Sequence, residues 1–175
     1  MSTPRTASPT GPAPASTAGV DERLFAAEYA KLRRFASFVA SASIEPDDLV
    51  QEALSRALAK GPLSGLDKPG AYLRRTMLNI AINETRRTGR EAAALGRLEQ
   101  QRPGRGSVDP AGAPDLSVLD RLPVTSRTLI FLVDVEDQSI NDAAAFVGMS
   151  SVAARAQLSR ARRALNDHLS KETDR

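Results

Sequence analysis

The stretch Ser139–Leu165, SINDAAAFVGMSSVAARAQLSRARRAL, contains the start and stop signals of two short helices joined by a tight turn. Ser139 followed three residues later by Asp142 is a capping-box start, in which the serine hydroxyl accepts a hydrogen bond from an otherwise unpaired amide. Gly148 can adopt the left-handed conformation that closes a helix, and Ser150 can cap the next helix two residues later. This pattern predicts a helix-turn-helix.

The second helix of this pair is rich in arginine. Small and apolar residues recur at a spacing of three and four, which places Ala154, Leu158, Ala161 and Leu165 on one buried face. Arginine can clamp phosphate or guanine edges, and glutamine and serine can hydrogen-bond base edges. The residues of this helix predicted to contact DNA are Ser151, Arg155, Gln157, Ser159, Arg160, Arg162 and Arg163. The alternative is an ordinary helical hairpin whose arginines form a solvated face.

The composition favours small helical cores. The chain has 175 residues, of which 41% are hydrophobic but only 4% are aromatic, and its net charge is +3. This length suits one ordinary domain or two small ones, with alanine-rich helices. The longest purely aliphatic and aromatic run, Leu129–Val133, is too short to span a bilayer. We therefore expect a soluble, cytoplasmic protein with no membrane insertion.

The sequence offers no catalytic or metal-binding motif. It contains no cysteine, which excludes disulfides and thiolate zinc sites, and its one histidine is His168, near the chain end. No H-E-x-x-H, P-loop or G-x-G-x-x-G pattern occurs. We therefore predict no catalytic residue, no metal site and no cofactor, and a protein that is not an enzyme.

The N-terminal half begins with a tail and two predicted helices. Residues 1–20 consist almost wholly of Pro, Ser, Thr, Ala and Gly, and we expect them to be disordered. Apolar residues then recur at helical spacing over 21–41, and a second helix is predicted over 47–60, after Pro46. The polar residues that point outward from this second helix are Asp48, Gln51 and Glu52. They form either a solvated face or a docking patch for a basic partner.

A third helix, predicted over 71–87, presents basic and amide side chains opposite its apolar face. Guanidinium groups clamp phosphate and amides can read bases, so this face suits a polyanion. Its members are Arg74, Arg75, Asn79, Asn83, Arg86 and Arg87. Leu78 and Ile82 interrupt the face, which indicates either burial under another element or apolar contact with bases or protein.

The second half of the chain follows a stretch rich in glycine and proline. Residues 89–114 are predicted to be a flexible linker, and 171–175 a short tail. Between them, residues 115–170 are expected to form four helices, one of them capped by Thr125 and continued by the buried run Leu129–Val135. The predicted fold is all-α, with a three-helix domain over 21–88 and a four-helix domain that contains the helix-turn-helix.

Two segments in this order, roughly residues 28–87 and 116–169, are joined by the predicted linker and resemble the extracytoplasmic-function group of bacterial sigma factors, on the strength of three stretches. The first, DDLVQEALSRAL, is similar to the region 2 helix that docks on core RNA polymerase, which implies this role for Asp48, Gln51 and Glu52. The second, AYLRRTMLNIAINETRR, looks like the helix that captures the minus-ten element, with Tyr72 where the family usually has tryptophan. The segment from Leu119 to Leu165 is similar to the region 4 domain that reads the minus-thirty-five element.

This resemblance implies a sigma factor that binds core RNA polymerase and promoter DNA, together with an anti-sigma partner that masks these surfaces. Two alternatives remain. One is a helix-turn-helix repressor or activator that binds an operator without polymerase. The other is a degenerate sigma-like adaptor that acts only through protein contacts.

Overall fold

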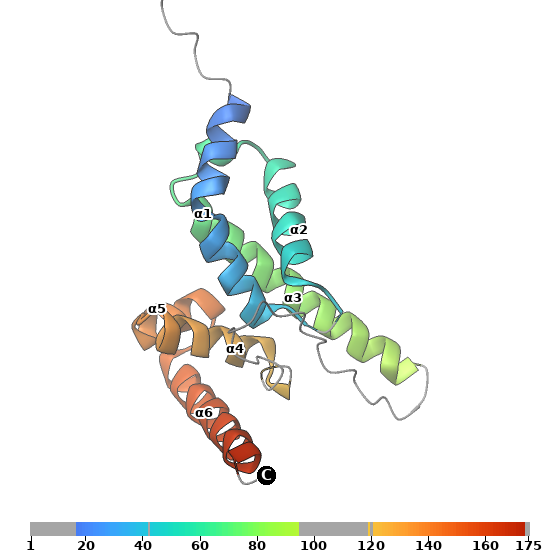
Figure 1. The fold of residues 1–175 in the computed structure, drawn as a ribbon, viewed down its shortest axis with the longest axis vertical. Coiled ribbons are helices and arrows are strands. Elements are labelled where there is room, and N and C mark those ends of the chain that lie inside the picture. Colours follow the sequence, from blue (N-terminus) through green and yellow to red (C-terminus); the bar gives the residue numbers. More distant parts are fainter. Residues whose placement is uncertain (1–16, 42, 95–118, 120, 174–175) are drawn as a thin grey trace, which may run out of the picture.

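The structure, a computed structural model, describes residues 17–41, 43–94, 119 and 121–173, which form helices and turns without a strand (Figure 1). The elements of the first half are α1 (Thr17–Val39), α2 (Pro46–Leu58), the 3-10 turn η1 (Leu63–Gly65) and α3 (Pro69–Ala94). Those of the second half are α4 (Val124–Ile130), the π-helical turn η3 (Phe131–Val135), α5 (Ile140–Val147) and α6 (Ser151–Thr173). The all-α prediction is confirmed.

Three helices are longer than the sequence predicted. Helix α1 begins at Thr17, inside the predicted tail, and α6 continues to Thr173, into the predicted C-terminal tail. Helix α3 runs to Ala94, although the linker was predicted from residue 89. Arg87 pairs with Glu84 and Glu91, one turn away on either side, and alanines follow, so this segment favours a helix. The rest of the predicted tails and linker, residues 1–16, 95–114 and 174–175, lies outside the described residues.

Helices α1, α2 and α3 pack against one another and form the first helical group (Figure 1). Pro46 occupies the first turn of α2, where its missing amide hydrogen is not needed, and Asp47 and Asp48 complement the positive end of that helix. Apolar residues of all three helices are buried together, among them Leu32, Phe35, Leu49, Val50, Ala53, Leu73 and Met77. The three-helix arrangement therefore follows from the periodicity of each helix.

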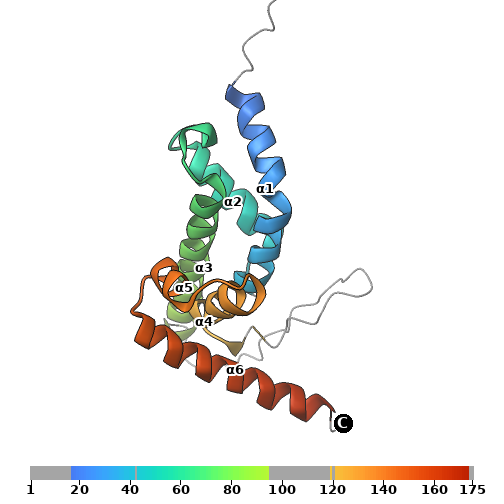
Figure 2. The ribbon, with the colours of Figure 1, turned by 90° about the vertical axis from the view of Figure 1, so that its left-hand side faces the viewer.

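Helices α4, α5 and α6 form the second group, in which α5 and α6 make the predicted helix-turn-helix (Figure 2). The hydroxyl of Ser139 accepts a hydrogen bond from the Asp142 amide at 3.1 Å. Gly148 ends α5 with a φ of 81°, and the hydroxyl of Ser150 accepts from the Ala153 amide at 3.2 Å. Each of the three local signals in the sequence thus has the geometry that it predicted.

The start of α4 differs from the prediction. This helix begins at Val124, with Pro123 at the N-cap and no side-chain cap, so the prediction that Thr125 caps it is wrong. Proline lacks an amide hydrogen and holds a φ suited to a helix entry, which leaves the threonine hydroxyl available to another partner. The buried run that follows is helical as predicted, and it ends in the π-turn η3 before Asp137, which has a φ of 53°.

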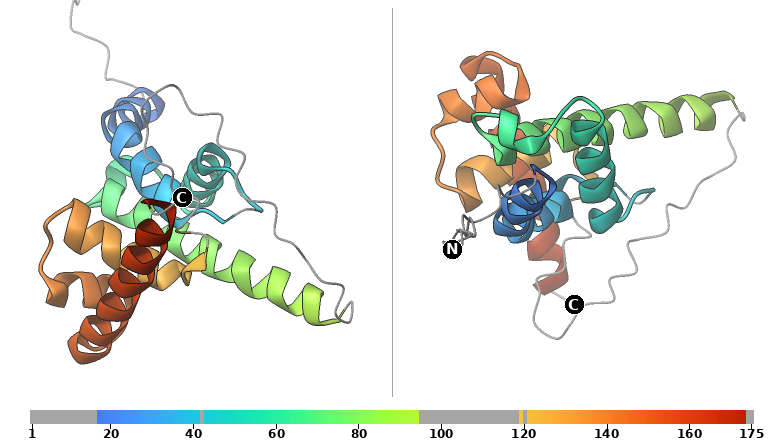
Figure 3. Two further views of the ribbon diagram at one scale, coloured as in Figure 1. Left: turned by 60° about the horizontal axis from the view of Figure 1, so that its bottom comes forward. Right: turned by 90° about the horizontal axis from the view of Figure 1, so that it is seen from above.

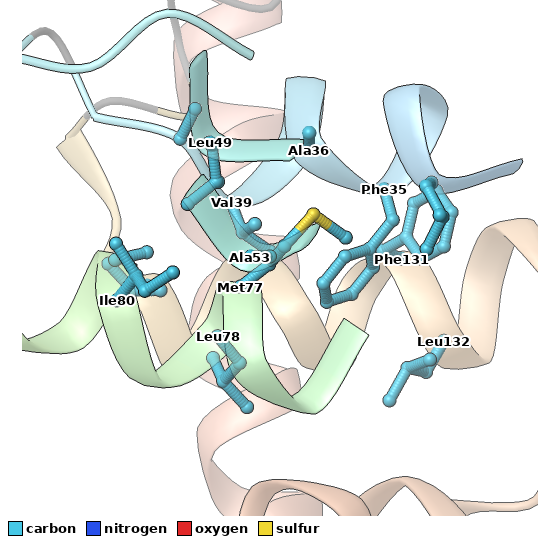
Figure 4. Close-up of a cluster of buried hydrophobic side chains, with 14 of the residues drawn as sticks. Phe35, Ala36, Val39, Leu49, Ala53, Met77, Leu78, Ile80, Phe131 and Leu132 are labelled. Carbon is cyan, nitrogen blue, oxygen red and sulfur yellow. The ribbon is translucent and has the colours of Figure 1, made fainter. Parts of the chain in front are cut away.

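The two groups share one hydrophobic core. Figure 4 shows Phe131 of η3 beside Phe35 of α1, and the ring centroids lie 5.3 Å apart in an edge-to-face arrangement. Leu78 of α3 is 1% exposed in this core, so burial under another element accounts for its place on a polar face. Helix α4 packs on α1 and α3 as well as on α6, and Figure 3 shows α3 and α6 leaving this centre in different directions.

Candidate functional site

The outer face of α6 carries two arginines that project into solvent. Arg155 and Arg160 are exposed, and within the described part of the chain neither takes part in a hydrogen bond or ion pair. Ala156 beside them is also exposed, so little side-chain bulk covers the helix backbone there. A helix presented in this way fits a DNA major groove, where arginine reaches guanine and phosphate.

The first turn of α6 presents a residue that the sequence analysis missed. The side chain of Val152 is 73% exposed, whereas the predicted contact Ser151 is half-buried. Residues at the start of a recognition helix are those that reach base edges, and an aliphatic group there can contact the methyl group of thymine. Val152 is an apolar residue that lies outside the buried stripe of α6. This mismatch between an apolar side chain and an outward position is the sequence signal that could have identified it.

Gln157 does not face solvent with the arginines. Its amide nitrogen donates hydrogen bonds to the hydroxyl groups of Thr125, at 2.6 Å, and Ser126, at 3.0 Å, both on α4. The side chain therefore helps to hold α6 against α4. Gln157, which the sequence analysis placed among the residues that contact DNA, is thus engaged within the chain in this structure.

The remaining polar residues of α6 are partly engaged within the chain. Arg162 pairs with Asp134, with 3.2 Å between its Nε and Oδ2, and this hydrogen-bonded carboxylate raises the pKa of the guanidinium. Arg163 donates to the Ser159 hydroxyl at 3.4 Å, a long contact. Arg163 remains exposed, so it can still reach a phosphate.

The second half of α3 presents a continuous polar stripe. Asn79, Asn83 and Arg86 are all exposed and follow one another at helical spacing, and Arg90 continues the stripe by one turn. Sequence reasoning missed Arg90 because it assigned residue 89 to the linker. A hollow lined by Asn83, Arg86, Gly89 and Arg90 runs along this stripe. The amide and guanidinium groups here can bind both bases and phosphates.

Arg87 differs from its neighbours on the stripe. Its guanidinium forms hydrogen-bonded ion pairs with Glu84 and Glu91, each at 2.6 Å, and the Glu84 contact contributes most to raising its pKa. The same contact lowers the pKa of Glu84. Because these three residues are neighbours along one helix, their pairing is readable from the spacing alone.

The first half of α3 is occupied by contacts with other elements. Arg74 donates from one guanidinium nitrogen to both carboxylate oxygens of Glu136, at 2.9 and 2.8 Å. The guanidinium of Arg75 lies 5.8 Å from the ring centroid of Phe146 on α5. Tyr72 is half-buried, with the Lys60 ammonium 6.0 Å from its ring centroid. Of the positions predicted on this face, Asn79, Asn83 and Arg86 are therefore exposed along the second half of α3. The others contact residues of the same chain: Tyr72, Arg74, Arg75 and Arg87.

Helix α2 presents Asp48, Gln51 and Glu52 on an exposed face, as its periodicity predicted. Glu52 accepts a hydrogen bond from Arg56 one turn later, at 2.6 Å, and both side chains remain about half exposed. Helix α2 packs on α1 and α3 (Figure 1). This acidic face is thus open to a partner.

Asp47 anchors α2 to α1. Its carboxylate accepts a hydrogen bond from the Tyr29 hydroxyl at 2.8 Å and another from Arg33 at 3.0 Å. The Tyr29 hydrogen bond is the main reason that the pKa of Asp47 lies below its usual value, and the same bond raises the pKa of Tyr29. These contacts fix the rotation of α2 and hence the direction in which its acidic face points.

The described residues contain no cluster of three or more histidine or acidic side chains that could hold a metal ion. None of the helices in the described part of the chain is long and apolar enough to cross a membrane.

Two family models match the two helical groups. Residues 24–91 match sigma-70 region 2, and residues 116–165 match sigma-70 region 4. The chain belongs to the extracytoplasmic-function sigma factors. Sigma factors are regulatory, non-enzymatic proteins that act together with RNA polymerase. The family therefore gives this chain the general role of a sigma factor.

Individual sigma factors are similar over most of the chain. The extracytoplasmic-function RNA polymerase sigma factor SigM of two Mycobacterium tuberculosis strains, Erdman and H37Rv, is 28% identical over 145 residues, which cover 81% of this chain and 72% of SigM. The sigma factor RpoE of Bartonella quintana, solved in complex with the anti-sigma factor NepR, is 25% identical with a TM-score of 0.68. That similarity covers 85% of this sigma factor and 96% of RpoE.

Proposed function

We propose that this sigma factor binds core RNA polymerase through the acidic face of α2 and directs initiation by contacting two promoter elements. Region 2 contacts the minus-ten element through α3, and region 4 contacts the minus-thirty-five element through α6. The observation that carries this proposal is the presence of two exposed cationic faces on separate helical groups, with an acidic face elsewhere on the first group.

The proposed polymerase contact consists of Asp48, Gln51 and Glu52. Their side chains are exposed, and Asp47 holds the helix in place without belonging to this face. An acidic patch of this kind favours a basic partner surface and excludes acidic ones. A polyanion such as DNA would be repelled here, so protein and DNA contacts are kept on different faces.

The proposed DNA contacts follow from the exposed residues of α3 and α6. On α3 they are Asn79, Asn83, Arg86 and Arg90, with Tyr72, Arg74, Arg75 and Arg87 joining if their present contacts are released. On α6 they are Val152, Arg155, Arg160 and Arg163, with Ser151, Ser159 and Arg162 at the margin. Each surface offers few phosphate contacts, so each alone should bind DNA weakly, and the two together should bind more tightly.

An anti-sigma partner is part of the proposal. The related RpoE was solved in complex with the anti-sigma factor NepR. The structural similarity to the present chain extends over nearly the whole of RpoE. We extend a partner of this class to the present chain, where it would compete with polymerase or DNA for the charged faces.

Transcription reconstituted with core RNA polymerase tests the proposal. The chain, mixed with core enzyme and a promoter library, should produce transcripts that start at a defined set of promoters. Tight operator binding without core enzyme, and no transcripts with it, would instead support an operator-binding repressor or activator. Core binding without any initiation would support the adaptor.

Charge reversal at Glu52 tests the polymerase surface. Glu52→Arg should weaken core binding at least tenfold, because it places a cation against a basic partner, while the fold is retained. Glu22→Arg is the matched control, since Glu22 is an exposed acid on α1 outside the proposed surfaces. Equal core binding by both variants would remove α2 from the proposal.

Removal of Arg155 tests the upstream DNA contact. Arg155→Ala should reduce binding to the upstream element by about tenfold or more, the usual effect of losing one bidentate base contact. Arg34→Ala is the control, because Arg34 is an exposed arginine on α1. If selectivity for the upstream element is the same in both variants, Arg155 does not read it.

A further inference from the structure

One arginine of α6 is paired with an acid from outside its own helix. The Nε atom of Arg162 donates to Oδ2 of Asp134 at 3.2 Å, and its Nη2 atom donates to Oδ1 of the same carboxylate. Two parallel hydrogen bonds of this kind occupy one edge of the planar guanidinium group. Arg162 therefore differs from the exposed Arg155 and Arg160, because the protein itself supplies its counter-ion.

The acid that pairs with Arg162 comes from the turn that follows α4. Asp134 lies in η3 and faces α6, whereas nearby Glu136 accepts hydrogen bonds from Arg74 of α3 at 2.9 and 2.8 Å. Asp137 is exposed, and among the described residues it makes no hydrogen bond or ion pair through its side chain. Asp134 is thus the acid of this turn that reaches the helix proposed to contact DNA.

The position of Arg162 along α6 suits the DNA backbone better than the bases. Residues in the first turns of a recognition helix reach base edges, and in α6 these turns include Val152 and Arg155. Arg162 lies about 10 Å beyond Arg155 along the helix axis and on nearly the same side, since about two turns separate them. Its guanidinium group is therefore placed to contact phosphates, which position a protein on the duplex.

The ion pair contributes little to the stability of the fold. The side chain of Arg162 is 51% exposed and that of Asp134 is 32% exposed. Water and salt screen a pair with this exposure, so its effect on the free energy of unfolding is small. The buried residues Ala154, Leu158 and Ala161 already hold α6 in place. The main consequence of the pair is therefore expected at the surface, in the charge that α6 presents to a partner.

Resting on the DNA contact proposed for α6, we propose that Asp134 limits the affinity of region 4 for DNA by occupying the edge of Arg162 that would otherwise clamp a phosphate. Carboxylate and phosphate are both bidentate acceptors for a guanidinium group, so they compete for the same donors. The carboxylate also repels a phosphate that approaches this flank of α6. Because phosphate contacts are independent of sequence, their loss leaves a larger share of the binding to the base contacts of Val152 and Arg155.

Substitution of Asp134 tests this proposal with the chain alone and a random-sequence DNA duplex, since phosphate contacts need no promoter. Asp134→Asn should bind the duplex about tenfold more tightly at low salt, the size of one hydrogen bond to a charged group. The plot of log affinity against log salt concentration should steepen by about 0.9, which corresponds to one further phosphate contact. Weaker binding by Asp134→Asn would overturn the proposal, because the carboxylate would then orient Arg162 toward DNA.

Asp137→Asn is the matched control. It removes the same charge from the same turn, no arginine of the described residues pairs with Asp137, and asparagine tolerates the φ of 53° at this position. We expect this variant to bind the duplex less than about threefold more tightly than the natural chain, because salt screens a charge that makes no contact. Equal gains in affinity and in salt dependence from the two substitutions would indicate a general charge effect and contradict a specific role of Asp134.

A second substitution shows whether the gain in affinity depends on Arg162. Arg162→Ala combined with Asp134→Asn should return the affinity and its salt dependence to about those of the natural chain, because the released guanidinium group is then absent. A double variant that keeps the gain of Asp134→Asn would count against competition for Arg162. Urea denaturation of the same variants should give closely similar midpoints, which separates these effects from unfolding.

Duplex binding and reconstituted transcription can fail independently. Unchanged duplex binding by Asp134→Asn, together with transcription from defined promoters, would remove the role of Asp134 and keep the proposed sigma function. The expected gain in duplex binding without any transcription would keep the role of Asp134 and remove the sigma function.

Discussion

Gln157 of α6 donates hydrogen bonds to the hydroxyls of Thr125, at 2.6 Å, and Ser126, at 3.0 Å, on α4. We expect Gln157→Ala to destabilise the fold by about 1–3 kcal/mol, because it leaves part-buried hydroxyls without this partner. Promoter selectivity should be unchanged. Urea unfolding and a promoter-library selection measure the two effects, and Asn166→Ala, an exposed amide on the same helix, is the control. Altered promoter selectivity with an unchanged free energy of unfolding would instead indicate that Gln157 contacts DNA bases.

Val152 is 73% exposed at the start of α6, and we expect it to contact the methyl group of a thymine in the upstream element. Val152→Ala should weaken promoter binding about fourfold, the effect of roughly one buried methylene. Replacing the contacted thymine by uracil removes the methyl group and should have a similar effect, and the two changes together should add little more. Binding of polymerase with variant sigma factor to substituted promoters measures this. Uracil outside the element is the control, and full additivity would contradict the contact.

Phe131 packs against Phe35 and Phe38 across the two helical groups. Phe131→Ala should lower the free energy of unfolding by about 3–5 kcal/mol, because it leaves a cavity in the shared core. Phe25→Ala should cost less, since Phe25 is half-buried and contacts Tyr29 at the edge of α1. Urea denaturation gives both values. A loss below about 1 kcal/mol for Phe131→Ala would indicate that the groups do not share a core in solution.

The Tyr29 hydroxyl holds the pKa of Asp47 below its usual value. Because the pKa of this carboxyl is lower in the folded chain than in the unfolded chain, its ionised form stabilises the fold at pH values above about 4, the pKa in the unfolded chain. This contribution to the free energy of unfolding is lost as the pH falls through the lower pKa of the folded chain. Tyr29→Phe should raise the pKa of Asp47 and reduce the stability gained above pH 4, by less than about 1 kcal/mol because the site is exposed. NMR titration of the Asp47 carboxyl measures the shift. An unchanged titration in Tyr29→Phe would show that the hydroxyl has no such effect.

The helices themselves were largely predictable, because their signals act within one or two turns. Ser139 with Asp142, Gly148 and Ser150 each fix a helix end through neighbours a few residues away, and all have the expected geometry. The errors lie at boundaries. Thr125 matched a cap pattern, but Pro123 begins the helix instead, and the pairs of Arg87 carry α3 past the predicted end.

The candidate site was predictable only as a set of helix faces. Periodicity places Arg155, Asn83 and Glu52 outward, as the structure has them. Periodicity does not say which outward residue another element will cover. Gln157 lies 32 residues from Thr125, and Arg74 lies 62 residues from Glu136. No pattern of three or four residues contains such pairings.

The sequence by itself determined the helices, the helix-turn-helix and the charge of each face, because capping and amphipathic periodicity are local properties. Only the tertiary structure decided which charged residues are free, which are paired, and that both helical groups pack around Phe131. The physical reason is that burial and ion pairing depend on the residues that meet in space. For Arg74 the partner is Glu136, which a separate turn brings to it.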